Sequence, residues 1–372
     1  MIIAGEVSGD IHGAALVRAL QNKLPALEVA GTGGEQMRAA GVEILYDIEE
    51  MAVMGLAEVL KHLRRLRQIF AGVCDYAVRQ RPDAVVLIDY PGFNLRLANH
   101  MHRHGIPVIY YICPQVWAWK RSRIKQMART IKHLITIFPF ENRCFDDTGL
   151  AVDYVGHPLV DELAEARREW VDAANPLRRA QVALLPGSRT AEITRLLPVM
   201  LAAAEKLAVK HPELKFVIAA ASPGMEKVIS GIMAGMHLPS GRFEIVCRQT
   251  RRVLCESRAA VVASGTATVE TALLGCPMVV IYKVAPLTYA IGRLVVNVPH
   301  IGMVNILAGR EICPELLQGA ATPAAVAAAL EPLTHDTPQR RRMCDDLAGV
   351  AAALGTGGSA AKAAEIVARY LG

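Results

Sequence analysis

The sequence predicts an α/β protein made of two Rossmann-like, doubly wound domains that face each other across a cleft. The chain has 372 residues, of which 52% are hydrophobic and 20% charged, so it is too long for one ordinary core and too apolar for disorder. Short β-branched strands alternate with helical runs, as they do in a parallel sheet. This alternation of strand, glycine-containing turn and helix begins at residue 2 and again at residue 182.

The first domain is expected over residues 1–165. A strand, a glycine-rich turn at 5–10 and a helix from residue 14 open the chain, as in a nucleotide-binding α/β domain. Ser8 and Gly9 lie in this predicted turn, which places them at the cleft. The opening strand is short for the centre of a sheet, which indicates that further residues precede it in the natural chain. Other strands are predicted at residues 84–89, 108–112 and 134–138.

A charged helical run and an Asn-Pro pair at residues 163–177 predict the linker. The second domain is expected over residues 178–340 and repeats the order of strand, turn and helix. Its strands are predicted at residues 182–185, 215–221, 243–246, 259–263 and 278–282. Residues 341–372 are rich in alanine and predict a C-terminal helical segment that packs back on the first domain.

The composition excludes several classes of protein. The sequence contains no run of about 18 apolar residues and no signal peptide, which predicts a cytoplasmic protein. Its eight cysteines form no C-x-x-C pair, which argues against a zinc site or a disulfide scaffold and predicts reduced thiols used in packing. Only 5% of the residues are aromatic and no nucleic-acid-binding motif occurs, so nucleic acid is not expected as a partner.

The second half of the chain is basic, which suits a ligand that bears phosphate. Residues 1–165 carry 18 Lys and Arg against 19 Asp and Glu, which leaves 23 against 16 for the rest. Within this half, an apolar strand turns into a helix at Ser264, Gly265 and Thr266, so backbone N–H groups and hydroxyls converge at a helix N-terminus. Glu270 follows one turn later, where its carboxylate can accept hydrogen bonds from two adjacent ribose hydroxyls.

A second candidate phosphate site follows the strand that ends in Pro-Gly. Ser188 and the next backbone amides start a helix there, and the guanidinium of Arg189 can bind a diphosphate. Taken alone, the pattern fits equally well an ordinary β–α turn with a solvated arginine. It matches neither the dinucleotide fingerprint G-x-G-x-x-G nor the P-loop with its lysine, so neither NAD binding nor phosphotransfer from ATP is indicated.

Asp89 is the candidate general base. It ends a strongly apolar strand, which places its carboxylate at the carboxyl edge of the sheet, where α/β proteins bind ligands. Helix capping is the structural alternative, but Asn94 stands directly before the following helical run and is the better cap. Asp89 is therefore predicted to remove a proton from a substrate.

Residues 51–68 predict a basic amphipathic helix. Its apolar positions include Leu56, Leu60 and Leu63, and Arg64 and Arg65 stand beside them. Such a helix can lie on an anionic membrane surface, or it can be a core helix with a solvated basic face. The pattern by itself favours the second interpretation.

Seven short strings, in unbroken order from the first residues to about residue 318, closely resemble lipid-A-disaccharide synthases. They are AGEVSGD at 4–10, DYPGFN at 89–94, PQVWAW at 114–119, VGHP at 155–158, LPGSR at 185–189, ASGTAT at 263–268 and NILAGRE at 305–311. Several of these strings are specific to that family and are not shared by all two-domain glycosyltransferases.

The resemblance implies an inverting glycosyltransferase of GT-B architecture that acts in lipid A biosynthesis, for the lipopolysaccharide of the Gram-negative outer membrane. Such an enzyme transfers 2,3-diacylglucosamine from UDP to the 6-hydroxyl of 2,3-diacylglucosamine 1-phosphate (lipid X) and forms the β-1,6-linked disaccharide 1-phosphate. By the family pattern, Arg189 meets the donor diphosphate, Glu270 and Asn305 lie in the UDP site, and Asp89 faces the acceptor. No metal cofactor is expected, because Arg189 and helix-terminal amides can neutralise the leaving group.

The resemblance also changes the interpretation of residues 51–68. Both substrates carry acyl chains, so this segment is expected to contact the inner leaflet of the inner membrane, with the enzyme bound peripherally. The protein is expected to be either a monomer or an oligomer.

Two other kinds of enzyme have the same architecture: a transferase that glycosylates a polyprenyl-linked peptidoglycan precursor, and a UDP-sugar 2-epimerase. The strings at 89–94 and 117–119 argue against both. A module that only binds nucleotide would have no use for Asp89.

Overall fold

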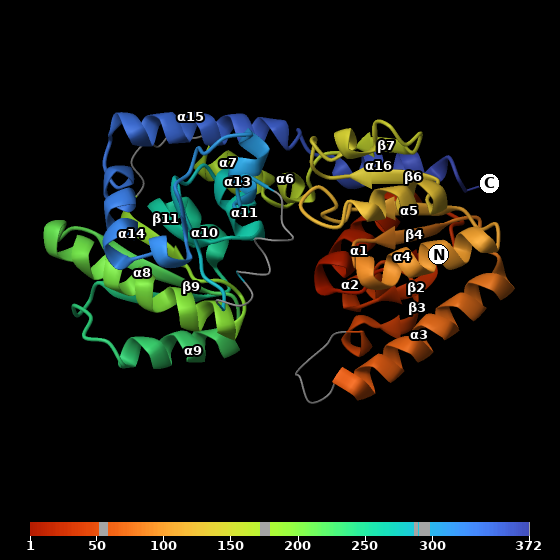
Figure 1. Ribbon diagram of the computed structural model, residues 1–372, viewed down its shortest axis with the longest axis horizontal. Helices are drawn as coiled ribbons and strands as arrows, with labels where there is room; N and C mark the ends of the chain where they lie inside the picture. Colours follow the sequence, from red (N-terminus) through yellow and green to blue (C-terminus); the bar gives the residue numbers. More distant parts are fainter. Residues whose placement is uncertain (52–58, 172–178, 286–288, 290–297, 372) are drawn as a thin grey trace. The chain divides into compact units, whose positions relative to one another are not determined.

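The chain folds into two units, each built on its own parallel sheet (Figure 1). The computed structural model describes residues 1–51, 59–171, 179–285, 289 and 298–371. Unit 1 comprises Met1–Asp161 and Leu354–Gly372, and unit 2 comprises Glu162–Ala353. The boundary lies a few residues earlier than the predicted linker, since part of that stretch forms helix α7 (Ala164–Trp170) of unit 2.

Unit 1 holds a seven-stranded sheet in the order β3-β2-β1-β4-β5-β6-β7 among its described residues. Its strands are β1 (Ile2–Ile3), β2 (Ala30–Gly33), β3 (Glu43–Asp47), β4 (Val85–Ile88), β5 (Val108–Tyr111), β6 (His133–Thr136) and β7 (Ala151–Tyr154). Every neighbouring pair is parallel. The helices α1 (Val7–Gln21), α2 (Glu35–Ala39), α3 (Val59–Gln80), α4 (Pro91–Arg103), α5 (Ser122–Thr130) and α16 (Ser359–Ala368) accompany it.

The helices of unit 1 cover both faces of the sheet and bury two separate cores. One core contains residues of α3, α4 and α5, and the other contains residues of α1, α2 and α16. Successive residues of β4 alternate between them, since Val85 and Leu87 join the first core while Val86 and Ile88 join the second. A strand buried on both faces needs a continuous apolar run, which is why β4 was recognisable in the sequence.

The C-terminal segment is divided between the units. Helix α15 (Pro338–Ala353) belongs to unit 2, whereas residues from Leu354 onward belong to unit 1. There α16 packs beside α1 and contributes Ile366 and Val367 to the second core. Asp161 anchors this segment by accepting hydrogen bonds from the backbone N–H groups of Gly358 (2.6 Å) and Ser359 (3.0 Å).

Unit 2 holds a six-stranded parallel sheet in the order β10-β9-β8-β11-β12-β13 among its described residues. Its strands are β8 (Arg179–Leu185), β9 (Lys215–Ala220), β10 (Phe243–Cys247), β11 (Ser257–Ala263), β12 (Met278–Tyr282) and β13 (Glu315–Leu317). Its further helices are α8 (Thr190–Lys210), α9 (Pro223–Ala234), α10 (Thr250–Glu256), α11 (Thr266–Leu273), α13 (Met303–Ala308) and α14 (Pro323–Leu330). The short helix α6 (Pro158–Glu162) precedes α7.

The prediction of two doubly wound, parallel α/β domains is confirmed by both sheets. All eight cysteines are free thiols, and five of them are buried, as expected for packing residues. Among the helices in the described part of the chain, none is long and apolar enough to span a membrane.

Candidate active site

The predicted site residues follow the strands on either side of the point where each sheet changes its direction of winding. This point lies between β1 and β4 in unit 1 and between β8 and β11 in unit 2. Open α/β sheets bind ligands outside the carboxyl ends of the strands at such a switch point. Asp89 directly follows β4, Ser188 and Arg189 follow β8, and Ser264 and Gly265 follow β11.

Asp89 and Tyr90 form a strained turn at the end of β4. Their φ angles are 42° and 45°, in the left-handed region that costs an L residue about 1–3 kcal/mol. The Nδ2 group of Asn94 holds the turn by donating to the carbonyl oxygens of Ile88 (3.1 Å) and Asp89 (2.8 Å), and the Tyr110 hydroxyl also donates to the carbonyl oxygen of Asp89. Asn94 was predicted to cap the helix, but it lies inside α4 and fixes this turn instead.

The carboxyl group of Asp89 has a raised pKa. The pKa of Asp89 is raised from 3.8 to about 6, mainly by burial and in addition by the nearby Glu6 carboxylate, while the backbone N–H of Tyr90 lowers it. A general base is most useful when its pKa lies near the operating pH. The backbone geometry and the pKa therefore both suit the proton-accepting role predicted for Asp89.

The turn predicted at residues 5–10 is the start of a helix. Helix α1 begins at Val7, so Ser8 and Gly9 lie in its first turn, and their prediction as loop residues is wrong. Gly9 allows the first turn of α1 to pack closely against the end of the strand, because a Cβ atom at this position would lie 3.2 Å from the Cβ of Ala4. Asp10 is buried and accepts three backbone N–H groups around the start of α2 at 2.7–3.0 Å, which gives it a structural role.

Two further carboxyl groups near Asp89 were missed in the sequence. Glu6 is the exposed N-cap residue of α1, and its charge acts on Asp89. Glu141 is 1% exposed and accepts the backbone N–H of Phe138 at 3.2 Å. The pKa of Glu141 is raised to about 8, mainly by burial and to a smaller extent by the charge of Asp89, against hydrogen bonds such as that from Phe138 that lower it. Glu6 stands inside the AGEVSGD string and could have been proposed from it, whereas nothing in the sequence marks Glu141 as buried.

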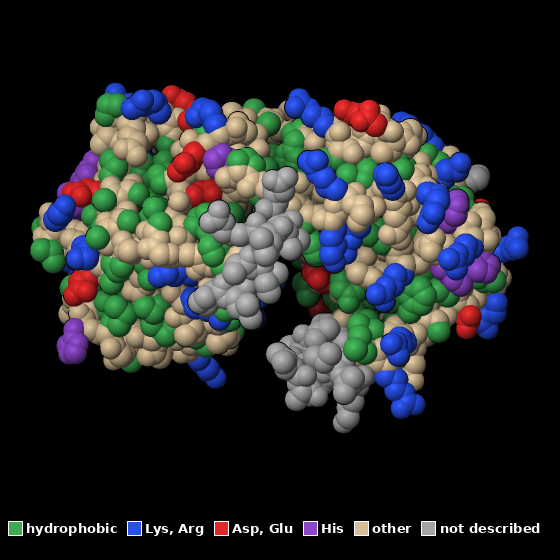
Figure 2. Space-filling view, viewed as in Figure 1, with side chains coloured by type: hydrophobic (Ala, Val, Ile, Leu, Met, Phe, Trp, Pro, Cys, Tyr) green, Lys and Arg blue, Asp and Glu red, His purple; other side chains and the backbone are tan. Residues whose placement is uncertain are grey.

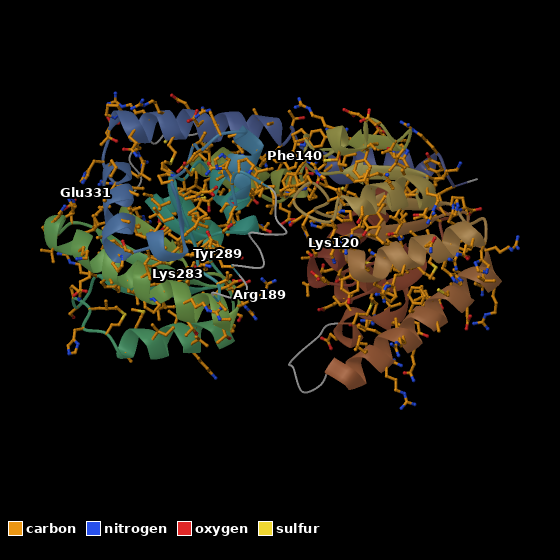
Figure 3. The ribbon with its side chains drawn as sticks, in the orientation of Figure 1. Lys120, Phe140, Arg189, Lys283, Tyr289 and Glu331 are labelled. Atoms are coloured by element: carbon orange, nitrogen blue, oxygen red, sulfur yellow. The ribbon has the colours of Figure 1, made fainter. Side chains whose placement is uncertain are left out.

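Arg189 stands at the start of α8 with its side chain 80% exposed (Figure 3). Its Nη1 lies 3.0 Å from Oε1 of Glu192, and the backbone N–H of Ser188 donates to Oε2 of the same carboxylate at 3.3 Å. Gly187 makes room for this carboxylate, because a Cβ atom there would lie 2.4 Å from Oε2. Glu192 thus accepts the two hydrogen bonds that Ser188 and Arg189 would offer to a phosphate.

The turn after β11 presents a second helix N-terminus. Gly265 and Thr266 are exposed at the start of α11, and no side chain caps this helix. Ser264 is turned back into the protein, where its hydroxyl donates to the carbonyl oxygen of Ile301 at 3.0 Å. An uncapped helix start with exposed backbone N–H groups favours an anion.

The carboxylate of Glu270 forms an ion pair with Arg251. The Nε group of Arg251 lies 3.0 Å from Oε1 of Glu270, and Nη2 lies 2.7 Å from Oε2 of Glu162. Arg251 was missed in the sequence, although it lies in the first turn of a helix that directly follows a strand. Lys283 was missed as well and follows β12, the strand next to β11 (Figure 3). The carboxyl edge of this sheet therefore carries three cationic side chains, of which Arg189 and Arg251 are paired with carboxylates.

Asn305 is fully buried, and its amide is used within the protein. Nδ2 donates to the carbonyl oxygen of Cys313 (2.8 Å) and to Oε1 of Glu315 (2.7 Å). Its Oδ1 accepts the backbone N–H groups of Ile312 and Cys313, both at 2.9 Å. With donors and acceptor engaged in this way, the side chain holds residues 311–315 in place and does not present its amide to a nucleotide, contrary to the sequence-based expectation.

Helix α3 has one buried face and one basic face. Ile69 and Val73 are buried, whereas Leu63 is 46% exposed beside the exposed Arg64 and Arg65. Lys and Arg side chains gather on the face of unit 1 that carries α3, α4 and α5 (Figure 2). Exposed Lys and Arg residues of these helices include Arg64, Arg65, Arg67, Arg96, Arg103 and Lys125. Leu56 and the side chain of Leu60 lie outside the described residues.

Solved structures of other proteins share this fold over nearly the whole chain. A putative UDP-N-acetylglucosamine 2-epimerase from Listeria monocytogenes matches 99% of this chain and 95% of its own, with a TM-score of 0.65 and 14% sequence identity. MurG from Acinetobacter baumannii matches 99% of this chain and 98% of its own, with a TM-score of 0.60 and 16% identity. At these identities the likeness establishes the fold, which is the GT-B architecture.

Relatives with similar sequences identify the family. The lipid-A-disaccharide synthetase family profile matches residues 1–367. The lipid-A-disaccharide synthase of Geobacter sulfurreducens is 41% identical over 378 residues, which cover 100% of this chain and 97% of the relative. That of Syntrophus aciditrophicus is 42% identical over 367 residues, which cover 98% and 95%. The chain therefore belongs to the lipid-A-disaccharide synthase family of UDP-sugar glycosyltransferases and acts in the synthesis of the lipid A disaccharide.

Proposed function

We propose that this protein transfers 2,3-diacylglucosamine from UDP to the 6-hydroxyl of 2,3-diacylglucosamine 1-phosphate. The products are the β-1,6-linked disaccharide 1-phosphate and UDP. The observation that carries the proposal is Asp89, a carboxylate with a pKa near 6 that a strained turn holds at the switch point of unit 1. A protein that only binds nucleotide in unit 2 would need no such group in unit 1.

In the proposed reaction, Asp89 removes the proton of the acceptor 6-hydroxyl while that oxygen bonds to the anomeric carbon of the donor sugar. The bond from the anomeric carbon to the diphosphate oxygen breaks, and UDP leaves with the electron pair. A single displacement of this kind inverts the configuration at the anomeric carbon. The proton then rests on Asp89, whose raised pKa makes it a stronger base than an exposed aspartate.

The leaving UDP carries negative charge, which the switch point of unit 2 is suited to stabilise. Arg189 supplies a guanidinium, Lys283 an ammonium group, and the start of α11 its backbone N–H groups. These groups develop their full interaction as the diphosphate oxygen gains charge in the transition state. We propose on this basis that the transfer proceeds without a metal ion. In place of Asn305, Arg251 and Glu270 are the side chains proposed to line the nucleoside end of the pocket.

We also propose that α3 brings the enzyme to the cytoplasmic face of the inner membrane, where diacylated substrates reside. The exposed Leu63 and the basic face beside it support this placement. Flotation with anionic liposomes should weaken when Leu56, Leu60 and Leu63 are replaced by serine. Val209→Ser, at a 79% exposed apolar position of unit 2, is the matched control and should float as the wild type does. Equal flotation of the triple variant would remove α3 from the proposal.

The test of the reaction uses the purified full-length chain, UDP-2,3-diacylglucosamine and 2,3-diacylglucosamine 1-phosphate, with and without EDTA. Mass spectrometry should detect the disaccharide 1-phosphate in both samples. The anomeric proton coupling in the NMR spectrum of the product reports whether the new bond has the β configuration. Absence of product from folded protein would contradict the proposed reaction, and product that disappears with EDTA would contradict its metal independence. Conversion of UDP-N-acetylglucosamine alone into its 2-epimer would favour the epimerase instead.

A further inference from the structure

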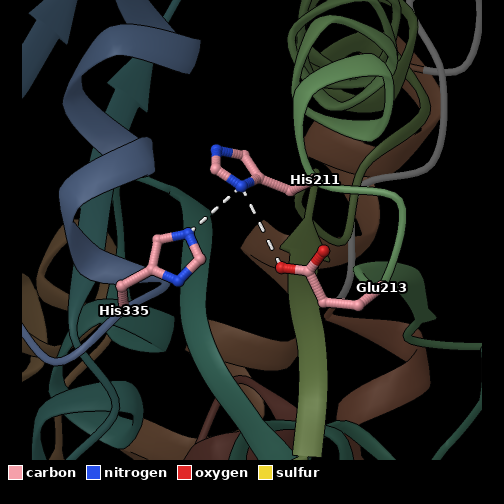
Figure 4. Close-up of side chains that lie close together, drawn as sticks. All are labelled: His211, Glu213 and His335. Atoms are coloured by element: carbon pink, nitrogen blue, oxygen red, sulfur yellow. Dashed lines mark hydrogen bonds and ion pairs between the residues drawn. The ribbon is translucent and has the colours of Figure 1, made fainter.

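Two histidines and a glutamate from distant parts of the chain meet at the C-terminal end of α8 (Figure 4). His211 is the C-cap residue of α8, and Glu213 follows two residues later. His335 lies 124 residues along the chain, just after the short helix η4 (Glu331–Leu333). All three side chains belong to unit 2, and none of them takes part in the site described above.

The ligand atoms of these side chains have spacings close to those of a metal site. Nε2 of His335 lies 3.3 Å from Nδ1 of His211, and Oε1 of Glu213 lies 4.0 Å from the same Nδ1 (Figure 4). Two nitrogens that bind one tetrahedral Zn²⁺ at 2.0–2.1 Å lie about 3.3–3.4 Å apart. The two histidines already have this spacing. Glu213 needs only a small side-chain movement to join them, and its side chain is 48% exposed.

A fourth residue, Glu331, is the hydrogen-bond partner of the other ring nitrogen of His211. Nε2 of His211 lies 3.0 Å from Oε1 of Glu331, so this nitrogen carries the hydrogen and donates it. The other nitrogen, Nδ1, is then left with its lone pair directed at His335 and Glu213. Lys210 contacts the second oxygen of Glu331 at 3.1 Å. A carboxylate behind a histidine in this way is the usual support of a histidine that binds metal.

We infer that His211, Glu213 and His335 form a binding site for a divalent transition-metal ion, with Zn²⁺ the best match to two imidazoles and a carboxylate. Water would complete the coordination. The ion would join the end of α8 to the segment between α14 and α15, two parts of unit 2 that are far apart in the chain. Helix α8 has 21 residues, so this site lies about 30 Å from Arg189 at its other end. Its role is therefore to stabilise unit 2 and is separate from glycosyl transfer.

The experiment is a titration of the metal-free full-length protein with Zn²⁺, read by calorimetry and by the melting temperature. One Zn²⁺ per chain should bind, and the melting temperature should rise. His335→Ala and, at a half-exposed position that cannot disturb the core, Glu213→Gln should each weaken Zn²⁺ binding at least tenfold. His237→Ala removes an exposed histidine elsewhere in unit 2 and should bind Zn²⁺ as the wild type does. Glu331→Gln, which leaves the three ligands in place, should weaken binding about 10–100-fold.

Co²⁺ distinguishes this site from the free cysteines of the chain. Bound to imidazole and carboxylate, Co²⁺ should give visible d–d bands without a thiolate charge-transfer band, and these bands should be lost in His335→Ala. Absence of Zn²⁺ binding by the wild type, equal binding by folded His335→Ala, or a thiolate charge-transfer band would each overturn the inference. In that case the contact between the two histidines would be a plain hydrogen bond.

Discussion

The two units have the same strand order around their switch points but place different charged groups there: carboxyl groups in unit 1, and cations together with carboxylates in unit 2. In unit 1 the carboxyl groups of Glu6, Asp89 and Glu141 surround the end of β4. In unit 2 the equivalent edge carries Arg189 and Lys283. The common topology determines where a ligand binds, and the few side chains at the strand ends determine what is done with it. The carboxyl groups of unit 1 suit proton removal from a hydroxyl, and the guanidinium and ammonium groups of unit 2 suit a diphosphate.

The backbone differs between the two switch points as well. Unit 1 places two consecutive left-handed residues, Asp89 and Tyr90, directly after its fourth strand. This turn stands in front of α4 and supplies a side chain. Unit 2 leads from β11 through Gly265 into an uncapped helix, which supplies backbone N–H groups. The same position in one topology thus presents a carboxylate in one unit and an uncapped helix start in the other.

The largest effect is expected from Asp89→Asn, which removes the proposed base and keeps the turn, since asparagine tolerates the left-handed conformation. Turnover should fall about 10²–10⁴-fold, the usual contribution of general base catalysis. The dissociation constant for UDP, measured by calorimetry, should stay within twofold because the nucleotide is proposed to bind unit 2. Asp147→Asn, at an exposed position of unit 1, is the control. Comparable turnover in Asp89→Asn would contradict the assignment of the base.

The same variant should be more stable than the wild type at neutral pH. The folded state holds the proton of Asp89 up to about pH 6, whereas the unfolded chain releases it near 3.8. The free energy of unfolding of the wild type therefore falls as the pH rises from 3.8 to about 6. The free energy of unfolding of the variant does not change in this way, because asparagine does not titrate. Above pH 6 the variant should gain about 2–3 kcal/mol in urea unfolding, and at pH 3.5 the difference should vanish.

Arg189→Gln should weaken UDP binding about 10–100-fold, because hydrogen bonds between charged partners contribute about 1.5–3 kcal/mol. Arg195→Gln, also exposed on α8, should bind UDP like the wild type. If both variants bind UDP with the same affinity, the helix N-termini and Lys283 bind the diphosphate without Arg189. The contrast between the two switch points then does not depend on Arg189.

Sequence patterns located the switch points because buried parallel strands are continuous apolar runs. The central strands β4, β5, β8 and β11 were all predicted, and the residues after them included Asp89 and Arg189. The strands that were missed, β2, β3, β7 and β13, lie toward the sheet edges and are short, glycine-containing or half-polar. Their pairing partners, and not their own composition, make them strands.

Roles that depend on partners far away in the chain were not predictable. Asn305 stands in a string that resembles the family, yet its amide binds the backbone seven and eight residues later. Arg251 meets Glu162 across 89 residues. His211 and His335 have no sequence spacing that suggests a metal site, because helix α8 and a distant loop bring them together. Residue type alone does not distinguish a ligand contact from an internal hydrogen bond.

The pH dependence of turnover tests the acidic switch point directly. Because the protonated carboxyl of Asp89 cannot accept a proton, kcat/KM should fall about tenfold per pH unit below pH 6. Glu6 raises the pKa of Asp89, so Glu6→Gln should move this acid limb to lower pH. If the acid limb of the pH profile is unchanged in the Glu6→Gln variant, burial alone raises the pKa of Asp89.

The smallest effect is expected from Glu192→Gln. The carboxylate of Glu192 accepts hydrogen bonds from Arg189 and from the backbone N–H of Ser188, so a diphosphate must compete with it for both donors. Exposed pairs of this kind contribute about 0.2–1 kcal/mol, so removal of the negative charge should tighten UDP binding about 1.5–5-fold. The gain should shrink in high salt, which screens exposed charges. Weaker binding by Glu192→Gln would instead mean that the carboxylate orients Arg189 toward the diphosphate, so that this switch point, like that of unit 1, depends on an acidic residue.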